Sequence, residues 1–308
     1  MERFLYRLLK ALLAGIQALP LTWVARLGRL GGGLAFRLDR RHRRVACDNL
    51  RQAFGTELPP AAIRELAREN FRRIGENFAC AARTAVMTER EVARVLEVSG
   101  VENIRADDPA LGRCRVMAIG HFGNFELYAR TTMQVPEFQE ATTYRALRQP
   151  LLNRLLQDLR ERSGCLYFER RTDSAALRRA MTEKRLMIGF LADQHAGDRG
   201  LPVPFFGREC STSAAPAVFA LRYDCPLHTA VCYRVGLARW RIEVGPAIPL
   251  QEDGQPRAIE RITADMNLAF ETAVRRDPAN WFWVHRRWKP GKHRRAPAPE
   301  DTPEPTPP

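Results

Sequence analysis

Two residues able to move a proton stand close together in the middle of the chain. His121 and Glu126 lie five residues apart in the run His-Phe-Gly-Asn-Phe-Glu, directly after the apolar segment 116–120, which predicts a buried strand. Residues 127–133 have helical character, so the pair would lie at a strand-to-helix turn, where open α/β sheets present reactive groups. A histidine whose tautomer is held by a carboxylate can act as a general base. The spacing therefore predicts proton abstraction by His121.

The nucleophile in such a reaction is expected to come from the substrate. The chain contains no Gly-x-Ser-x-Gly motif, and no plausible nucleophilic side chain stands beside His121. Zinc chemistry is not indicated, because the spacing differs from His-Glu-x-x-His and no third ligand is nearby in the sequence. His121 is thus expected to activate a substrate hydroxyl.

Polar side chains also end two other predicted strands. Asp193 and Gln194 follow the segment 187–192, and Arg145 closes the segment 141–145. Because the ends of parallel strands meet at one edge of a sheet, these side chains could line the same crevice as the histidine. An arginine at such a place can stabilise an oxyanion or bind a phosphate, and the alternative is an exposed surface charge.

Two aromatic segments allow more than one interpretation. Phe205 and Phe206 end a loop rich in glycine and proline, and they could be ordinary core residues or the wall of a channel for an alkyl chain. Residues 281–288 combine three tryptophans with two arginines and a histidine. This second segment could be an interfacial aromatic belt, a base-stacking patch or a packed C-terminal strand.

The pattern of apolar residues predicts an α/β fold. From residue 114 onward, strand-like segments alternate with helical ones, which argues for a mixed, mostly parallel central sheet flanked by helices. A further short strand is expected at residues 95–98. The other expected strands are 116–120, 141–145, 165–168, 187–192, 227–233 and 240–244, and the expected helices are 43–53, 60–89, 151–162, 174–182, 214–222 and 258–276.

Length and composition set the class of protein. A chain of 308 residues with 45% hydrophobic residues can form one large α/β domain with an N-terminal appendage. The seven cysteines form no Cys-x-x-Cys pair, so we expect reduced thiols in a cytosolic compartment and no disulfide framework. The net charge of +14 favours an anionic partner, which could be nucleic acid, an acidic membrane surface, or an acidic protein or substrate.

The first 44 residues are expected to associate with a membrane. Residues 4–18 and 21–38 are apolar stretches, but neither reaches the length of about 20 uninterrupted apolar residues that a spanning helix needs. A basic cluster follows at residues 37–44, a combination typical of a segment that lies on anionic lipid at the cytoplasmic face. A pair of buried helices with a solvated basic connector is the alternative. A nucleic-acid arm is disfavoured, because no aromatic residues alternate with the arginines.

These segments divide the chain into three expected regions. Residues 1–44 form the membrane-associating helical segment with its basic cluster, and residues 45–289 form the catalytic domain. Residues 290–308 are rich in proline and charge and should be disordered.

The order of the motifs resembles that of one enzyme family. The run 121–126 matches the His-x4-Asp/Glu signature of the lysophospholipid acyltransferase superfamily. Within that superfamily, residues 5–289 resemble the late acyltransferases of lipid A biosynthesis, the lauroyl and myristoyl transferases. The further matching blocks are 144–145 with 150–152, 160–163, 193–197 with 203–207 and 212, and 277–289.

The resemblance implies an O-acyltransferase with the glycerolipid acyltransferase-like fold. His121 would take the proton of an acceptor hydroxyl, and Glu126 would hold and polarise the imidazole. The alkoxide would attack the thioester of an acyl carrier protein or of CoA. Arg145 and Arg162 would stabilise the oxyanion or bind a substrate phosphate. No metal or bound cofactor is implied.

The resemblance also implies where the substrates bind. Asp193 and Gln194 would shape the acceptor pocket, and the Phe205 and Phe206 block would contact substrate. The partners would be the acyl donor, an anionic glycolipid or phospholipid acceptor, and the membrane, with no nucleic acid. The place of action would be the cytoplasmic face of the bacterial inner membrane.

Some residues depart from the pattern of this family. His195 stands where the family usually has aspartate, Gln149 stands where it has asparagine, and residues 279–281 also differ. These blocks face the acceptor, so a lipid A precursor is the first expectation and a lysophospholipid, another glycolipid or an aminolipid is the alternative. A thioesterase-like hydrolase and a basic binding protein without activity are the remaining alternatives.

Overall fold

A seven-stranded sheet forms the centre of the molecule. The computed structural model describes residues 2–105, 114–131 and 134–289, and of residues 2–5 only the backbone. The strands of the sheet are β1 (Leu96–Ser99), β2 (Arg115–Ile119), β3 (Gln139–Tyr144), β4 (Leu166–Glu169), β5 (Leu186–Leu191), β8 (Leu227–Gly236) and β9 (Arg239–Ile248). They follow the order β1-β9-β8-β2-β5-β3-β4, in which only the β8–β9 pair is antiparallel. The predicted mixed, mostly parallel sheet is confirmed.

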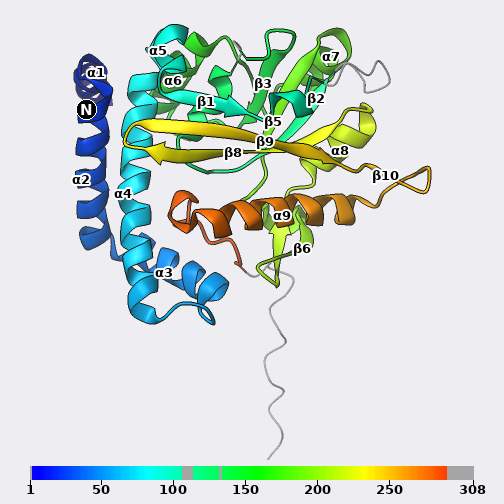
Figure 1. Ribbon diagram of the computed structural model, residues 1–308. Helices are drawn as coiled ribbons and strands as arrows, with labels where there is room; N and C mark the ends of the chain where they lie inside the picture. The colour runs from blue at the N-terminus through cyan, green and yellow to red at the C-terminus, as the bar shows by residue number, and fades with distance from the viewer. Residues whose placement is uncertain (1, 106–113, 132–133, 290–308) are drawn as a thin grey trace, which may run out of the picture.

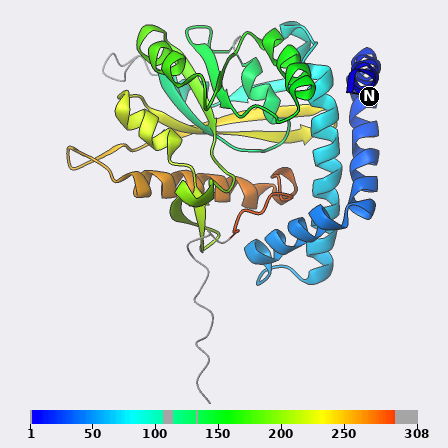
Figure 2. The same ribbon diagram turned by 180° about the vertical axis from the view of Figure 1, so that it is seen from behind.

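Helices cover both faces of this sheet. Those of the N-terminal part are α1 (Glu2–Ala18), α2 (Leu21–Leu38), α3 (Arg40–Phe54), α4 (Pro60–Thr84) and α5 (Glu89–Ala93). Those that follow are α6 (Pro150–Arg160), α7 (Ser174–Glu183), α8 (Ala215–Arg222) and α9 (Ile259–Arg276). Figure 1 shows α9 below the sheet, α5 and α6 above it, and the α2–α4 pair along one side; the view from behind in Figure 2 agrees. The expected flanking of the sheet by helices is therefore present.

Strand β2 lies inside the sheet and is covered on both faces. All five of its residues are buried, as expected for a strand with parallel neighbours on either side. Val116 and Ala118 belong to the hydrophobic cluster that includes α8 and α9, whereas Met117 and Ile119 belong to the cluster on the opposite face. Successive side chains point to opposite faces, so the sequence alternation decides which residues can reach which cluster.

The N-terminal apolar segment folds into two helices that pack on α4. Glycines allow this contact: a Cβ at Gly32 would lie 2.1 Å from the Phe71 carbonyl oxygen, and one at Gly75 would lie 2.2 Å from that of Gly28. Arg29 adds ion pairs to Glu69 and to the buried Glu76. Within the described residues, no helix combines the length and the apolar character needed to cross a bilayer. The expected boundary at residues 44–45 falls inside α3.

Several local predictions differ from the structure. The glycine- and proline-rich loop after β5 contains the antiparallel hairpin β6 (Leu201–Phe205) and β7 (Arg208–Thr212). A second hairpin joins β10 (Gln251–Glu252) to β11 (Gln255–Pro256). Where a helix was expected after His121, a 3₁₀ helix, η3, spans Phe125–Arg130, and residues 132–133 lie outside the described residues. The tail at 290–308 also lies outside them.

The short 3₁₀ helices occupy connections between the main elements. They are η1 (Val101–Asn103), η4 (Glu161–Ser163), η5 (Gly197–Arg199) and η6 (Pro278–Asn280), in addition to η3. Helix η4 continues directly from the end of α6, and η6 follows α9 by one residue. Of these, η3 and η6 lie at the edge of the sheet where β2 ends, where the backbone N–H of Gly123 donates to the Asn280 carbonyl.

Candidate active site

His121 lies two residues after the end of β2, and a carboxylate two residues after the end of the neighbouring strand β5 holds its side chain. The imidazole Nδ1 and the Oδ1 of Asp193 are 2.8 Å apart, and the backbone N–H of His121 donates to Oδ2 at 2.8 Å. This contact follows from the strand register, in which Ile119 lies opposite Leu191, because the residues two positions further along each strand also lie level. The fold thus joins residues that are 72 positions apart in the sequence.

Asp193 is enclosed by protein and keeps its negative charge. Its side chain is 1% exposed, and it also accepts a hydrogen bond of 2.7 Å from the indole Nε1 of Trp281. Burial by itself would raise the pKa of Asp193, but the charge of His121 and the hydrogen bonds from His121 and Trp281 hold that pKa below its ordinary value. An ionised carboxylate at Nδ1 keeps a proton on that nitrogen, so the lone pair of His121 lies on Nε2.

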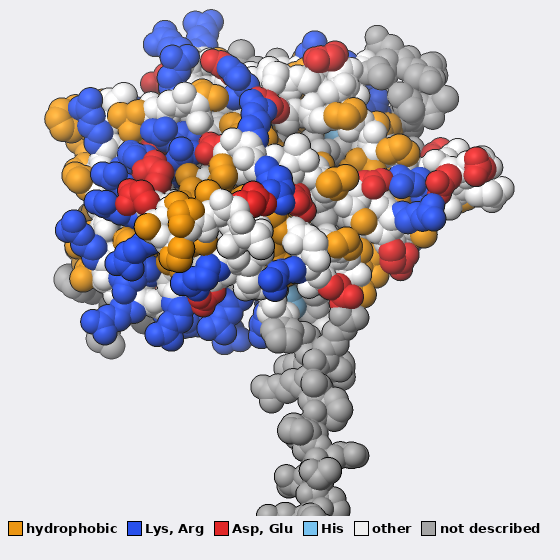
Figure 3. Space-filling model, turned by 60° about the horizontal axis from the view of Figure 1, so that its bottom comes forward, with side chains coloured by type: hydrophobic (Ala, Val, Ile, Leu, Met, Phe, Trp, Pro, Cys, Tyr) orange, Lys and Arg blue, Asp and Glu red, His pale blue; other side chains and the backbone are white. Residues whose placement is uncertain are grey.

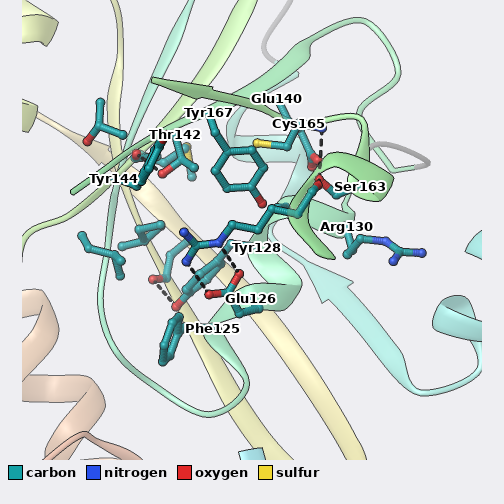
Figure 4. Close-up of a pocket in the computed structure, with 18 of the residues that line it drawn as sticks. Phe125, Glu126, Tyr128, Arg130, Glu140, Thr142, Tyr144, Ser163, Cys165 and Tyr167 are labelled. Carbon is teal, nitrogen blue, oxygen red and sulfur yellow. Dashed lines mark hydrogen bonds and ion pairs between the residues drawn. The ribbon is translucent and has the colours of Figure 1, made fainter. Parts of the chain in front are cut away.

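Glu126, the residue expected to hold the imidazole, is bound by an arginine instead. Its carboxylate accepts hydrogen bonds from Arg160 Nη2 at 2.7 Å and from Nε at 3.2 Å, drawn as dashed lines in Figure 4. Burial would lower the pKa of Arg160, but the hydrogen bonds and charge of Glu126 raise it. Gly123 turns the chain with φ of +52°, and η3 then carries Glu126 towards the end of α6. The expected imidazole contact therefore belongs to Asp193.

A large cavity opens beside the free nitrogen of His121. Its volume is about 860 Å³, near the upper end of the range for small-molecule sites. The walls come from α4, α6, η3 and one face of the sheet, where Met117, Ile119 and Met187 contribute apolar side chains. Figure 4 shows labelled aromatic side chains arranged around this space. In residues 2–105, 114–131 and 134–289, no protein group hydrogen-bonds to Nε2 of His121.

Two arginines at the cavity are available to an anion. Arg145 and Arg170 both line it, and neither forms an ion pair with any described residue. Desolvation first, and the neighbouring charge of Arg145 second, lower the pKa of Arg170. Arg162, which was expected beside Arg145, is instead exposed in η4 and outside the cavity wall. Arg160, two residues earlier, occupies the position at the cavity.

The residues expected to shape the acceptor pocket have different places. Gln194 lines the cavity, whereas Asp193 lies behind His121 and is not part of the cavity wall. His195, which follows, also lines the cavity. The sequence analysis placed Asp193 at the correct edge of the sheet but expected Glu126 to hold the imidazole, because the register between two strands cannot be read from either strand alone.

Phe205 and Phe206 belong to the core and not to the cavity wall. They are 2% and 8% exposed, and neither lines the cavity. Phe205 packs on Trp281 with 5.4 Å between ring centroids, and Phe206 packs on Trp283 at 6.4 Å. Core packing therefore replaces the proposed alkyl channel at this place. The segment 281–288 packs against the same core, and an isolated antiparallel bridge joins Trp281 to Phe122.

His285 is a residue of the site that sequence reasoning did not single out. It lines the cavity, and its Nε2 accepts a hydrogen bond of 3.0 Å from the backbone N–H of His195. Burial lowers the pKa of His285 to about 4, so the ring is neutral near pH 7. Because Nε2 is an acceptor, the proton lies on Nδ1. In the sequence, the feature that could have indicated a role for His285 is its position within the aromatic and basic segment 281–288.

The seven cysteines are free thiols, as the sequence predicted. Cys165 lies in the cavity wall, where burial raises the pKa of its thiol far above the ordinary value and disfavours the nucleophilic thiolate. Across the described parts of the chain, no group of three His, Cys, Asp or Glu side chains could hold a metal ion.

Comparison with known proteins gives a consistent assignment. Residues 1–290 match the family model for bacterial lipid A biosynthesis acyltransferases. The chain is 28% identical to the lipid A biosynthesis lauroyltransferase of Escherichia coli (strain K12) over 278 residues, covering 88% of this chain and 87% of that protein. It is 25% identical to the lipid A biosynthesis palmitoleoyltransferase of the same strain over 276 residues, covering 88% and 86%. The family model spans nearly the whole chain, and the chain therefore belongs to the bacterial lipid A biosynthesis acyltransferase family.

Proposed function

We propose that this acyltransferase moves a fatty acyl group from a thioester donor to a hydroxyl of a lipid A precursor, with His121 as general base. The donor is an acyl carrier protein thioester or acyl-CoA. The observation that carries the proposal is the His121–Asp193 pair at the end of β2, with the open Nε2 of its histidine beside the cavity. Membership of the lipid A acyltransferase family supports the choice of reaction and acceptor.

The His121–Asp193 pair is suited to moving one proton in each direction. Nε2 of His121 accepts the proton of the acceptor hydroxyl as the oxygen attacks the thioester carbon. Asp193, ionised and held by Trp281, stabilises the imidazolium that forms. When the tetrahedral intermediate collapses, the C–S bond breaks and the imidazolium returns the proton to the sulfur. The products are an acyl ester and a free thiol, and His121 is neutral again.

The cations at the cavity are suited to the negative charges of both substrates. Arg160 is fixed by Glu126 and stacks over Tyr167 with 5.3 Å from the guanidinium carbon to the ring centroid, so it is a preorganised donor in the cavity wall. In this proposal Glu126 acts by positioning Arg160. Arg145, together with Arg170, binds a phosphate of the acceptor or of the donor's carrier.

The apolar part of the cavity is suited to an acyl chain. On β2, Met117 lies two residues before Ile119, and both face the cavity, so an apolar surface extends about 7 Å down the strand from Ile119. Met187 continues this surface on β5, because it pairs with Arg115, which lies two residues before Met117 on β2. Gly189, opposite Met117, keeps this path open, because a Cβ there would lie 3.0 Å from the Cδ1 of Ile119. Gln194 contacts the acceptor at the opposite, polar end.

The reaction can be tested with the purified full-length protein. We would incubate it with a tetra-acylated lipid A precursor and a panel of acyl carrier protein and CoA thioesters, and follow products by mass spectrometry. The expected result is a gain of one acyl chain, which falls by about 10²–10⁴-fold in His121→Gln. Arg162→Gln, an exposed arginine outside the cavity, is the control and should keep the wild-type rate.

Other results would redirect the assignment. Acyl transfer to a lysophospholipid, another glycolipid or an aminolipid, with the lipid A precursor unchanged, would retain the chemistry and replace the acceptor. Release of free fatty acid without any acylated lipid would favour a hydrolase. Full activity in His121→Gln would refute the role of this histidine.

A further inference from the structure

A fully buried arginine lies behind the candidate active site. Arg287 is 0% exposed, and it forms no ion pair with any described residue. Many other Lys and Arg side chains of this chain lie at the surface, as Figure 3 shows for one face of the molecule. Taking a guanidinium out of water is costly unless hydrogen bonds and an opposite charge compensate it. The surroundings of Arg287 must therefore offset this cost.

The hydrogen bonds of Arg287 to described residues all go to neutral oxygens. Nη1 donates to the backbone carbonyls of Ser211 at 2.6 Å and of Gln194 at 3.3 Å. Nη2 donates to the hydroxyl of Thr212 at 2.7 Å and to the amide oxygen of Asn267 at 3.3 Å. The Nε–H has no partner among the described residues. The guanidinium thus ties the loop after β5 to β7 and α9, but none of these groups neutralises its charge.

The opposite charge comes from Asp193. Desolvation lowers the pKa of Arg287, and the neighbouring Cys210 and Asp193 oppose that shift. Burial raises the pKa of the Cys210 thiol, so this group is neutral near pH 7. Asp193 is ionised there, because its pKa is held below the ordinary value. Of these two neighbours, only Asp193 supplies a negative charge to the buried guanidinium.

Arg287 also fixes the loop that begins at the catalytic carboxylate. Gln194, whose carbonyl it binds, directly follows Asp193 in the chain. Beyond this point the loop is fastened to β7, because the Ala196 N–H donates to the Ser211 carbonyl at 3.2 Å. The Ser211 carbonyl accepts from Arg287 as well. One guanidinium therefore holds both the loop and the strand that supports it.

We infer that Arg287 is a positioning residue for catalysis, which anchors the loop after Asp193 and supplies the buried positive charge that keeps this carboxylate ionised. Arg287 does not touch substrate, because it is not part of the cavity wall. The inference rests on the proposed function, in which Asp193 acts through His121. Loss of the Arg287 charge would favour binding of a proton by the His121–Asp193 pair. A pair that has taken up this proton has no free lone pair on Nε2 and cannot act as a base.

The other titratable groups at this place do not replace the charge of Arg287. Among the described residues, those that face Asp193 or Arg287, besides His121, are Tyr128 of η3, Cys210 of β7, His195 in the loop after β5, and His285 of the C-terminal segment. Burial raises the pKa of the tyrosine and of the cysteine, and it lowers the pKa of both histidines. All four groups are therefore neutral near pH 7.

The pH profile of acyl transfer by the full-length protein tests this inference. We would measure kcat/KM with a detergent-dispersed tetra-acylated lipid A precursor and an acyl carrier protein thioester. Arg287→Met should move the acidic limb of the profile to higher pH by about 0.5–1 unit, because a positive charge near the pair is removed. Arg287→Gln, a second neutral variant that retains hydrogen-bond donors, should move it equally. Arg287→Lys retains the charge and should keep the acidic limb of the wild type.

Two control variants separate the charge of Arg287 from its packing and from net charge. Thr212→Val removes one hydrogen-bond partner of Arg287 and leaves its charge in place. Arg286→Met removes the neighbouring arginine, which is exposed. Both variants should keep the acidic limb of the wild type. Thermal unfolding of every variant shows whether it has folded.

Titration of the His121 ring by nuclear magnetic resonance gives a second readout without any substrate. The chain has six histidines, and the signal of His121 is the one that disappears in His121→Gln. Its titration midpoint should rise in Arg287→Met by the same amount as the acidic limb, and it should not move in Arg286→Met. This readout also separates the two proposals. Absence of acyl transfer by the wild type would refute the proposed function, whereas the titration would still report the effect of the Arg287 charge.

Three results would overturn the inference. The first is a wild-type pH profile and a wild-type titration of His121 in folded Arg287→Met or Arg287→Gln. The second is an equal displacement of the acidic limb in Arg287→Lys and in Arg287→Met, which would show that the hydrogen bonds act and the charge does not. The third is an equal displacement in Arg286→Met, which would attribute the effect to net charge and not to the buried position.

Discussion

His121 hydrogen-bonds to a carboxylate from a neighbouring strand, although a glutamate stands five residues away along the chain. The short connection to Glu126 passes through the left-handed turn at Gly123, where a Cβ would lie 2.5 Å from the Cys232 carbonyl oxygen. The turn directs Glu126 to Arg160. Two carboxylates therefore serve two different partners, one an imidazole and the other a guanidinium.

Double-mutant cycles on acyl transfer should separate these two partnerships. Glu126→Gln and Arg160→Gln should each reduce kcat/KM, and combining them should cost little more than the worse single change, because the two side chains act as one unit. Asp193→Asn should couple in the same manner to His121→Gln. We expect Asp193→Asn alone to lower kcat by about 10²-fold or more.

The cycles would contradict the assignment if Glu126 coupled to His121 and not to Arg160. In that case the loss of kcat/KM caused by Glu126→Gln would disappear in the His121→Gln background and would add to the loss caused by Arg160→Gln. Such a result would place Glu126 on the imidazole in the reacting state. Thermal unfolding of each variant serves as the folding control. Asp193→Glu is not expected to keep the activity that Asp193→Asn loses, because the carboxylate is enclosed and a longer side chain has no space.

The neutral ring of His285 should make stability depend on pH. The pKa of a histidine in the unfolded chain is about 6.5, and burial lowers the pKa of His285 to about 4. Between these values the unfolded chain binds a proton that the folded chain does not, so stability is full above about pH 6.5 and falls as the pH drops towards 4. The midpoint of thermal unfolding should therefore decrease more steeply below pH 6.5 in the wild type than in His285→Gln. Parallel curves for the two proteins would contradict this account.

At the scale of elements, the contact between α2 and α4 depends on the absence of side chains. Gly28 and Gly32 are one turn apart on α2 and meet Gly75 and Phe71 of α4 backbone to backbone. The close approach also buries the Arg29–Glu76 ion pair, whose glutamate side chain is 0% exposed. Glu76 in turn binds Arg234 of β8 at 2.8 Å, so α2, α4 and the sheet are linked through one carboxylate.

Two neighbouring glycines of α2 should respond to alanine in opposite ways. Gly32→Ala would bring a Cβ within 2.1 Å of the Phe71 carbonyl oxygen, and separating the helices should cost about 1–3 kcal/mol. Gly31→Ala meets nothing within 4 Å and should stabilise the helix by up to about 1 kcal/mol. Urea unfolding monitored by circular dichroism measures both values. Equal effects of the two changes on the free energy of unfolding would show that helix propensity, and not the contact with α4, determines the stability of α2.

At the scale of the whole molecule, the sheet, its flanking helices and the loops at the strand ends form the cavity together. The floor is one face of the sheet, the walls are α4 and α6, and the polar end is the set of loops where the strands finish. The other face of the sheet is filled by α8, α9 and the aromatic cluster around Phe205. The cavity therefore opens on one face of the sheet, beside a second hydrophobic cluster on that same face.

Acyl-chain selectivity should change when the cavity floor is altered. Met187→Ala shortens a side chain and so enlarges the deep end of the cavity. In competition, the ratio of longer to shorter acyl groups transferred should therefore rise by about tenfold or more. Met181→Ala is the matched control, because Met181 is also buried but belongs to the cluster on the other face of the sheet. Mass spectrometry of products from mixed donors measures the ratio. An equal shift in both variants would indicate general loosening of the fold.

Much of the α/β architecture was predictable from local patterns. Runs such as 116–120 and 187–192 predicted the strands to within about one residue, because parallel strands buried on both faces are continuously apolar. The hairpin β6–β7 was missed, because proline and glycine in its sequence are typical of loops. Arg162 was placed at the site and Arg160 was not, because the pattern cannot tell which of two nearby arginines points inward.

The sequence by itself determined the class of sheet, the family of the enzyme and the position of His121 at the end of a strand. These properties depend on local apolar patterns and on the order of motifs, which the chain carries directly. Only the tertiary structure decided that Asp193 holds the imidazole, that Glu126 pairs with Arg160 and that Phe205 lies in the core. Such contacts join residues far apart in the sequence, and they depend on strand register and on which face of an element meets the cavity.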